Sequence, residues 1–434
     1  MKTHFLLSGI IIASLFSLSL NSCTNKIPKE GIVLIEKEGK HVLYIDGKET
    51  YIKGVGGMNR LDMASQNGAN AFRTWGGNVE SVRNILKTAA EYNMYVMQGI
   101  GLTKDSARYF DDKYKEQLRN EVRALADTFK DNPHLLVWGI GNEIELGNAN
   151  IPEAWMFVEE LAQIIRSIDS RHLISTVTSH NAKALDLIAK YAPSLDIIGI
   201  NSYGSIGGVE QMVKNSEYNG PYLITEWGPT GFWETAKTSW NAPLEQTSEE
   251  KRIVYEDRYN QHIFGPGSCV GSFVFLWGQK EERTPTWFSM FVESNVPGLP
   301  LNGEKTPQVE AMERVWAREE PEQTAPVITG FKINEKKAIE SITLSVNEPI
   351  KANVSVHDKN EDTLTYIWEI LHEATVLGFG GSREPRPDRY GEVIISDTNQ
   401  IELAIKEAGK YRVYIYVSDN TGFVATANIP VLVQ

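Results

Sequence analysis

Two glutamates at the ends of apolar runs are the residues best placed to do chemistry. Residues 135–141 lead into Asn142-Glu143, and residues 222–225 lead into Glu226. Apolar runs of this length predict buried parallel strands, and a carboxylate at the end of such a strand has no packing role. Two carboxylates that face one cleft can cleave a glycosidic bond, with retention at a separation of about 5–5.5 Å and inversion at about 6.5–9.5 Å.

The elements that must position these glutamates form a repeating pattern, in which strand and helix signals alternate up to about residue 318. The expected strands cover residues 51–55, 69–75, 94–100, 135–141, 173–177, 195–200, 222–225 and 270–277. The expected helices cover residues 79–92, 112–130, 152–168, 183–191, 209–215, 248–264 and 306–318. Eight strand units in roughly 270 residues predict an α/β fold of the (β/α)8 TIM-barrel type. The alternative, a doubly wound sheet, needs a glycine-rich phosphate turn that residues 54–57 do not provide.

This strand count places Glu143 after the fourth strand and Glu226 after the seventh. The 83 residues between them fit three βα units of about 30 residues each. In a TIM barrel the carboxyl ends of all strands meet at the face where active sites form, so both side chains are expected there. Asn142-Glu143 could instead cap the next helix, but Pro152 begins that helix nine residues later.

Four further residues at strand ends are candidates for supporting roles. Arg73 closes the second strand and could hold a nucleophilic carboxylate in its charged form, or be part of a structural ion pair. Tyr203 follows the sixth strand and could donate to the same carboxylate. Asn142 could donate to a sugar hydroxyl beside the reacting carbon. His180 follows the fifth strand, either as a ligand contact or as a satisfied loop residue. No His, Cys and Asp cluster has metal-ligand spacing, so we expect no metal or cofactor.

The chain has ten tryptophans, and several fall beside predicted strand ends. Aromatic faces stack on the apolar faces of sugars, although each of these tryptophans could equally belong to the core. The candidates for sugar subsites are Trp75, Trp227, Trp233, Trp277 and Trp287. Trp277 is the strongest of them, because it closes the predicted eighth strand as the glutamates close theirs.

The N-terminus has the pattern of a targeting segment. A short basic start precedes the apolar residues 5–20, which are too few for a membrane span. Residues 20–23 resemble a bacterial lipoprotein signal cut before Cys23, and a plain secretory signal is the alternative. We therefore expect a signal peptide over 1–22, a tether over 23–30, and an outer-membrane lipoprotein of the cell envelope. Its only membrane contact would be the lipid anchor, on the periplasmic side or the cell surface.

The net charge narrows the class of partner, and the cysteine content excludes a disulfide. A net charge of -13 argues against nucleic acid, because nothing would neutralise the phosphates. After cleavage Cys269 alone would remain, so no disulfide forms within one mature chain, and we expect a buried, inert thiol. We expect a monomer whose partner is an uncharged polysaccharide or oligosaccharide.

Beyond the barrel, expected over 31–318 with an N-terminal hairpin, the pattern changes. Residues 319–326 are a polar, proline-containing linker. Short alternating strands without helices fill 327–434 and predict an immunoglobulin-like β-sandwich without a cysteine pair. Residues 378–390 form a long loop in it, rich in Gly, Pro and Arg, which is either functional or disordered.

Asn142-Glu143 and Thr225-Glu226-Trp227-Gly228 together resemble clan A of the retaining glycoside hydrolases. The resemblance implies that Glu143 is the acid/base and Glu226 the nucleophile. It also implies support roles for Arg73, Asn142, Tyr203 and Trp277.

Within the clan, the domain order and the spacing of the glutamates are most similar to glycoside hydrolase family 158. That resemblance implies a retaining endo-β-1,3-glucanase, acting on laminarin-type glucan by double displacement. Family 2-like enzymes usually have N-terminal β-domains, and family 5-like enzymes often have a His where this chain has Asn201, so both are less similar. Hydrolysis of another β-linked glycan, glucanosyl transfer, and non-catalytic glycan binding are the alternatives.

Overall fold

The computed structural model describes residues 29–378 and 381–434. The predicted signal peptide and Cys23 lie outside the described residues. Among the helices of the described ranges, none is long and apolar enough to cross a membrane.

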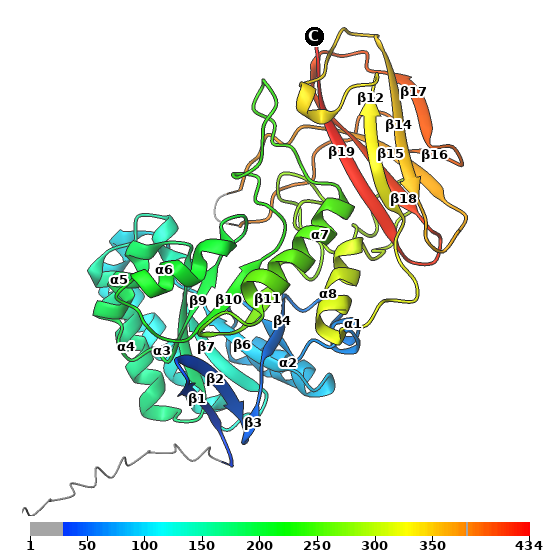
Figure 1. The fold of residues 1–434 in the computed structure, drawn as a ribbon. Coiled ribbons are helices and arrows are strands. Elements are labelled where there is room, and N and C mark those ends of the chain that lie inside the picture. The colour runs from blue at the N-terminus through cyan, green and yellow to red at the C-terminus, as the bar shows by residue number, and fades with distance from the viewer. Residues whose placement is uncertain (1–28, 379–380) are drawn as a thin grey trace, which may run out of the picture.

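Eight parallel strands close into a barrel, as the sequence predicts (Figure 1). They are β4 (Ile52–Gly56), β5 (Ala71–Arg73), β6 (Tyr95–Ile100), β7 (Leu135–Ile140), β8 (Leu173–Ser179), β9 (Ile197–Asn201), β10 (Tyr222–Trp227) and β11 (Cys269–Val274). Nearly all of their residues are buried, because side chains fill the barrel interior on one face and helices cover the other. The predicted TIM barrel is confirmed.

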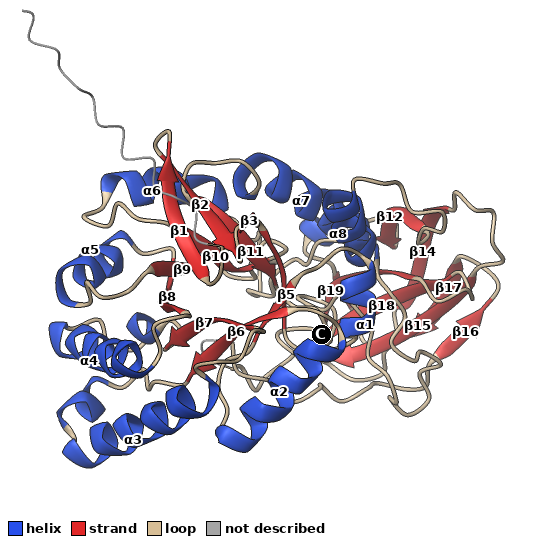
Figure 2. Ribbon diagram, turned by 90° about the horizontal axis from the view of Figure 1, so that it is seen from below, coloured by secondary structure: helices blue, strands red, loops and turns tan. Residues whose placement is uncertain are grey.

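Helices surround the barrel, as seen from below in Figure 2. They are α1 (Leu61–Gln66), α2 (Val79–Glu91), α3 (Asp112–Phe129), α4 (Pro152–Ile168), α5 (Ala182–Tyr191), α6 (Val209–Asn215), α7 (Ser248–Arg258) and α8 (Pro307–Ala317). Local signals fix several of their starts: Asn78 accepts the backbone N–H of Ser81 before α2, and Pro152 occupies the first turn of α4. The predicted helix over 248–264 is α7 followed by a π-helical turn, Tyr259–Ile263. The short helix α1 was not predicted from the sequence.

An N-terminal hairpin closes the bottom of the barrel. It consists of β1 (Ile32–Lys37) and β2 (Lys40–Ile45), with the short β3 (Lys48–Glu49) paired to β2. Ile32, Leu43 and Ile45 pack with Leu136 and Phe273 from the barrel interior. The hairpin therefore covers the end of the barrel opposite to the one where strand carboxyl ends meet.

The C-terminal part consists of two β-sheets and confirms the predicted sandwich. One sheet contains β12 (Val327–Ile333), β14 (Pro349–His357) and β17 (Gln400–Ala404); the other contains β13 (Thr343–Leu344), β19 (Val424–Val433), β18 (Gly409–Ser418), β15 (Thr365–His372) and β16 (Ile394–Ser396). Ile350 and Val354 of the first sheet pack with Trp368, Val413 and Ile415 of the second. In Figure 1 the sandwich lies at the end of the barrel away from the hairpin.

The two domains share a hydrophobic cluster. Leu299 and Leu301, from the long loop after β11, pack with Leu371, Tyr414 and other residues of the sandwich. Buried polar contacts reinforce this interface. The carboxylate of Glu245 accepts from Lys251 Nζ at 2.5 Å on the barrel side and from Asn428 Nδ2 at 2.6 Å on the sandwich side. The sandwich is thus fixed against the barrel.

Candidate active site

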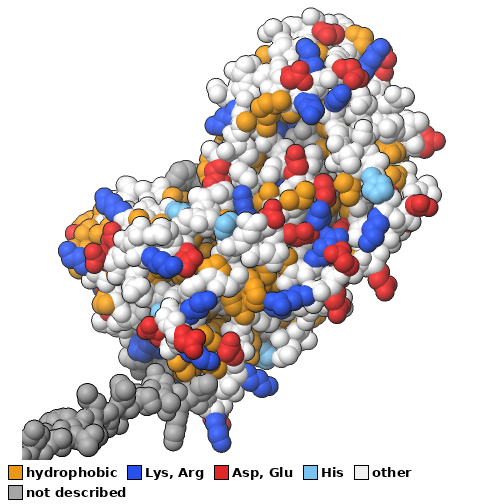
Figure 3. Space-filling model, in the orientation of Figure 1, with side chains coloured by type: hydrophobic (Ala, Val, Ile, Leu, Met, Phe, Trp, Pro, Cys, Tyr) orange, Lys and Arg blue, Asp and Glu red, His pale blue; other side chains and the backbone are white. Residues whose placement is uncertain are grey.

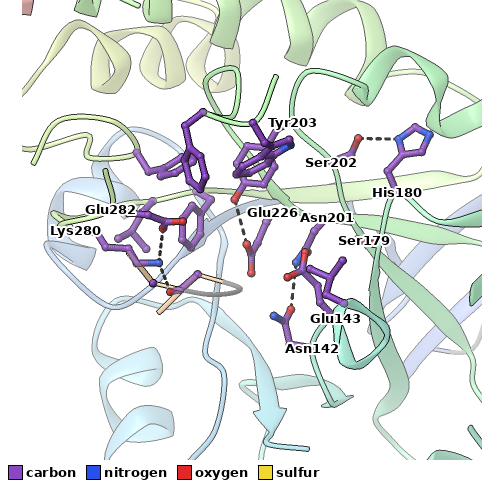
Figure 4. A pocket seen from close by; sticks show the side chains of 18 of the residues that line it. Asn142, Glu143, Ser179, His180, Asn201, Ser202, Tyr203, Glu226, Lys280 and Glu282 are labelled. Atoms are coloured by element: carbon purple, nitrogen blue, oxygen red, sulfur yellow. Dashed lines mark hydrogen bonds and ion pairs between the residues drawn. The ribbon is translucent and has the colours of Figure 1, made fainter. Parts of the chain in front are cut away.

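A cavity of about 750 Å³ lies at the carboxyl ends of the barrel strands, and both glutamates line it. Figure 4 shows Glu143 and Glu226 near its centre, with Lys280 and Glu282 on one side and His180 and Ser202 on the other. Among the described residues, no group of three or more His, Cys, Asp or Glu side chains is placed to hold a metal ion.

Glu226 is held by three hydrogen-bond donors. Its Oε1 accepts from Arg73 Nη1 and from the Trp75 indole Nε1, both at 3.0 Å, and its Oε2 accepts from the Tyr203 hydroxyl at 3.1 Å. Burial and the neighbouring Glu226 raise the pKa of Tyr203 well above its usual range, so this hydroxyl remains a donor. Three donors fix the direction of this carboxylate, which suits a nucleophile.

Arg73 links Glu226 of β10 to Asn142, which follows β7. It is the last residue of β5 and is 2% exposed. Its Nη2 donates to Asn142 Oδ1 at 2.6 Å, and Asn201 Nδ2 donates to the same oxygen at 3.2 Å. Because Oδ1 already accepts twice, the Asn142 amide is fixed with its NH2 group as the donor toward a substrate hydroxyl. Arg73 therefore positions Glu226 and Asn142 together.

Glu143 lies three residues beyond the end of β7, on a sharply turned backbone. Gly141 has φ 77° and Glu143 has φ 50°, a left-handed conformation that costs a non-glycine residue about 1–2 kcal/mol. The backbone N–H of Glu143 donates to Val177 O on β8 at 2.8 Å, which holds the turn in place. The side chain makes no helix-capping hydrogen bond, so the capping alternative is wrong. Strain of this kind is common at functional sites.

The surroundings of Glu143 favour its protonated form. Burial raises the pKa of Glu143 to about 7, the charge of Glu226 adds to this effect, and Lys104, with Nζ 3.7 Å from Oε2, opposes it. A general acid works best with a pKa near the operating pH. Two carboxyls in one cavity are thus placed in opposite environments, the arrangement that separates an acid from a nucleophile.

His180 and Trp75, two other predicted residues, line the cavity. His180 Nδ1 lies 3.0 Å from Ser202 Oγ, and burial lowers the pKa of this imidazole. His180 therefore presents a neutral ring beside a hydroxyl on one side of the glutamates. Trp75 contributes its indole N–H to Glu226 and its ring to the cavity wall.

Three predicted tryptophans are not in the cavity. Trp277 and Trp227 are fully buried and Trp287 is 1% exposed. Strand β11 ends at Val274, so Trp277 follows the strand rather than closing it; its indole donates to Arg60 O, and its ring packs on Phe291 and Trp316. Trp227 points outward because side chains alternate along β10, and it packs on Tyr255 and Tyr259. The Trp287 indole donates to Thr230 O. The predicted subsite roles of all three are wrong.

The aromatic wall of the cavity comes instead from loops after β10 and β11. Phe232, Trp233, Phe275 and Phe288 line it, and only Trp233 was a candidate. Trp233 is 52% exposed and stacks on Phe288, with ring centroids 6.2 Å apart at 29°. A half-exposed indole supported from behind is a suitable platform for a sugar ring. The sequence did contain a signal for this wall, because Gly231-Phe232-Trp233 follows shortly after the strand that ends near Glu226.

Two further groups of cavity residues were not anticipated. Glu234, Lys280 and Glu282 contribute charge, and Lys280 Nζ pairs with Glu282 Oε2 at 2.8 Å. Burial raises the pKa of Glu282, and Lys280 opposes this shift. Gly378, Gly381 and Arg383 come from the sandwich, within the loop that the sequence marked as functional or disordered.

The barrel has two carboxyls in different environments at the face where its strands end, and this is the architecture of a glycosidase. The comparisons with known proteins agree. Residues 56–255, just under half of the chain, match the family model of cellulase (glycosyl hydrolase family 5). Together with the relatives described next, this match supports a clan A glycoside hydrolase. Asn201, where family 5-like enzymes often have a His, made family 5 less similar than family 158; the family model that matches is nevertheless that of family 5, and family 158 stays a prediction.

The proteins to which this chain is similar include two mannan endo-1,4-beta-mannosidases and a beta-glucuronidase. A probable mannan endo-1,4-beta-mannosidase A of Aspergillus flavus is 24% identical over 35% of this chain and 36% of its own length. Mannan endo-1,4-beta-mannosidase F of Aspergillus clavatus is 22% identical over 40% and 37%. The chain thus spans little more than a third of these relatives. Among solved structures, a beta-glucuronidase of an uncultured Clostridium sp. has a TM-score of 0.50 at 16% identity, over 66% of this chain and 54% of its own, and shows the fold alone.

Proposed function

We propose that this protein is a retaining, endo-acting hydrolase of a neutral β-linked polysaccharide. The observation that carries the proposal is the pair of carboxyls in one cavity, with Glu226 held by three donors and the pKa of Glu143 raised to about 7.

The mechanism follows from these two environments. A Glu226 oxygen attacks the anomeric carbon while Glu143 gives its proton to the leaving glycosidic oxygen, which forms a glycosyl ester and releases one part of the chain. Glu143, now a carboxylate, takes a proton from water, whose oxygen attacks the anomeric carbon and frees Glu226. Asn142 is positioned to donate to the hydroxyl next to that carbon during both steps.

A neutral substrate fits the charge of the cavity. Four glutamates line it, Glu143, Glu226, Glu234 and Glu282, against the cations Lys280 and Arg383. Lys280 is already paired with Glu282. A uronate would enter a site with excess negative charge, which disfavours its binding. The face in Figure 3 has acidic and basic side chains interspersed, with no basic patch that would attract an acidic polymer.

Endo action is supported by the extent of the cavity on both sides of the glutamates (Figure 4). A glycan chain can therefore place sugars beside Lys280 and Glu282 and beside His180 and Ser202 at once. Attack within a chain requires room on both sides of the reacting bond, whereas a closed end would favour release from chain ends.

Within this class we propose β-1,3-glucan as the first substrate, from the order of barrel and sandwich. β-1,4-Mannan is the second candidate, because the two Aspergillus relatives are named as mannanases. The test is a panel of laminarin, β-1,4-mannan, mixed-linkage β-glucan and a polyuronate, with product sizes followed over time. We expect intermediate-length products early from a neutral glycan, with Glu226→Gln inactive. Cleavage of the polyuronate alone, or substantial activity in Glu226→Gln, would overturn the proposal.

The stereochemical course is a separate test. Proton NMR of the first product should show the β-anomer before mutarotation, as double displacement requires. An initial α-anomer would mean inversion. Products longer than the substrate would instead identify a transferase.

A further inference from the structure

The wall of the cavity on the Lys280 side contains residues from the other domain. Gly378, Gly381 and Arg383 belong to the loop between β15 and β16 of the sandwich, yet they line the cavity that contains the catalytic glutamates. They lie more than 150 residues from Glu226 in the sequence. The site is therefore built from both domains.

Described residues on both sides of Arg383 are attached to the barrel. Gly381 O accepts from Lys280 Nζ, and the backbone N–H of Glu384 donates to Glu281 O at 3.0 Å. Arg383 thus lies between two anchored positions, and its own side chain is exposed to the cavity. An anchored backbone restricts where this guanidinium can reach.

The strongest anchor is the side chain of Glu384, which is 2% exposed. Its Oε2 accepts from the backbone N–H of Arg283 at 2.7 Å, and its Oε1 accepts from Arg283 Nη1 at 3.1 Å and from the Gly378 N–H at 2.7 Å. Arg283 in turn lies 4.2 Å above the ring of Phe232 in the aromatic wall. One carboxylate therefore joins the sandwich loop to the barrel and to the wall that supports Trp233.

A second anchor lies at Arg386, three residues beyond Arg383. Arg386 pairs with Glu293 of the barrel domain at 2.7 Å and with Glu369 of β15 at 2.7 Å. Both glutamates are buried or nearly so, and buried paired charges tolerate little displacement. The described residues 381–386 of the loop are consequently held in place and form a fixed wall.

We propose that Arg383 is a substrate-binding residue that donates to glycan hydroxyls on the Lys280 side of the cavity, and that Glu384 is the positioning residue that holds it there. This inference rests on the proposed function, because the ligand is the same neutral glycan. The planar guanidinium has five donors and can reach two adjacent hydroxyls at once. Lys280 and Glu282, which lie beside Arg383, form an ion pair with each other. The guanidinium of Arg383 therefore provides the available donors on that side of the cavity. The sandwich then contributes to substrate binding and is more than a spacer.

The test compares Arg383→Ala with the wild type on the glycan that the wild type cleaves in the panel. Arg383 is exposed, so its removal should leave the melting temperature unchanged. We expect KM to rise about tenfold with kcat nearly unchanged, the effect of losing a hydrogen bond from a charged donor. Lys351→Ala is the matched control, since it removes a positive charge from β14 of the same domain, in an exposed pair with Glu402. Its KM should equal that of the wild type.

Glu384 is tested by a conservative pair of variants. Glu384→Ala should raise KM as Arg383→Ala does, and Glu384→Gln, which retains the acceptor oxygen, should restore part of the affinity. Binding of an oligosaccharide to Glu226→Gln and to Glu226→Gln/Arg383→Ala, measured by calorimetry, gives a readout independent of turnover, and we expect it to weaken about tenfold.

The outcomes separate the two proposals. A wild type that cleaves no glycan of the panel contradicts the proposed function. A wild type that cleaves one, together with an Arg383→Ala variant of unchanged KM and unchanged oligosaccharide affinity, contradicts this inference alone. An equal rise of KM in Lys351→Ala would also overturn it, because the effect would then come from general charge.

Discussion

Replacing Lys104 with Met should move the alkaline limb of the pH–activity profile upward. If Glu143 is the general acid, kcat/KM falls as this carboxyl loses its proton, with an apparent pKa near 7. The Lys104 ammonium lies 3.7 Å from Glu143 Oε2 and lowers the pKa of that carboxyl. Its removal therefore raises the pKa, and the acid remains protonated to higher pH.

The size of the shift follows from the distance and the exposure. At 3.7 Å two unit charges interact by about 1.1 kcal/mol in a water-like dielectric and by about 4.5 kcal/mol at an effective dielectric of 20. The Lys104 and Glu143 side chains are 25% and 14% exposed and Lys104 Nζ itself is buried, so the interaction exceeds the smaller value. At 1.36 kcal/mol per pKa unit, the limb should move upward by at least about one unit, to an apparent pKa of about 8 or above.

The assay is kcat/KM against pH for the wild type, Lys104→Met and Lys115→Met. Lys115 pairs with Asp112 on α3 and does not line the cavity, so its loss controls for net charge. Added salt should change the difference between the wild type and Lys104→Met only slightly, because a buried ammonium is screened much less than an exposed one. An alkaline limb that stays in place or moves downward in Lys104→Met would refute Glu143 as the acid governed by this ammonium.

Three other outcomes follow from the same structure. Glu143→Gln should abolish hydrolysis and also stabilise the fold at pH 8.5, on the order of 1–3 kcal/mol by denaturant unfolding. Because folding raises the pKa of Glu143 from 4.5 to about 7, the wild type has its full stability below pH 4.5 and loses part of it as pH rises through about 7. Glu143→Gln cannot lose this part, so an equal gain in the stability of the variant at pH 4 would contradict the explanation. Trp233→Ala should raise KM without changing the melting temperature, whereas Trp277→Ala should cost about 3–5 kcal/mol of stability, and the reverse pattern would restore the subsite role of Trp277. Tyr203→Phe should lower kcat about 10- to 100-fold through loss of one donor to Glu226, and unchanged kcat would show that this donor is dispensable.

The barrel and its central residues were predictable because they depend on local patterns. Buried parallel strands are continuous apolar runs, and counting them places Glu143, Glu226 and Arg73 at one end of the barrel. The count failed at Trp277 for a physical reason. The apolar run continues past Val274 because the residues after β11 are also buried, so apolar character alone does not mark where the strand ends.

The outer part of the site could not be predicted in this way. Phe288 lines the cavity only because the long loop after β11 folds back over it, and Arg383 lines it only because the sandwich docks on that loop. No periodic pattern in the sequence predicts which loops come into contact when the barrel and the sandwich pack together. The composition of residues 378–390 indicated that the loop was unusual. Only the structure shows that Gly378, Gly381 and Arg383 of this loop line the cavity.

The division of roles between the glutamates now has a basis besides sequence resemblance. The motif alone assigned Glu143 as acid through its neighbour Asn142. The structure gives each carboxyl a different set of contacts: Glu226 accepts from three donors, on Arg73, Trp75 and Tyr203, whereas for Glu143 burial and the charge of Glu226 outweigh the Lys104 ammonium and a hydrogen bond from Asn201. Donors stabilise a carboxylate, and burial beside a like charge stabilises a carboxylic acid. These contacts favour the assignment that the motif predicts, and the roles of Glu143 and Glu226 stay a prediction for the variants above to test.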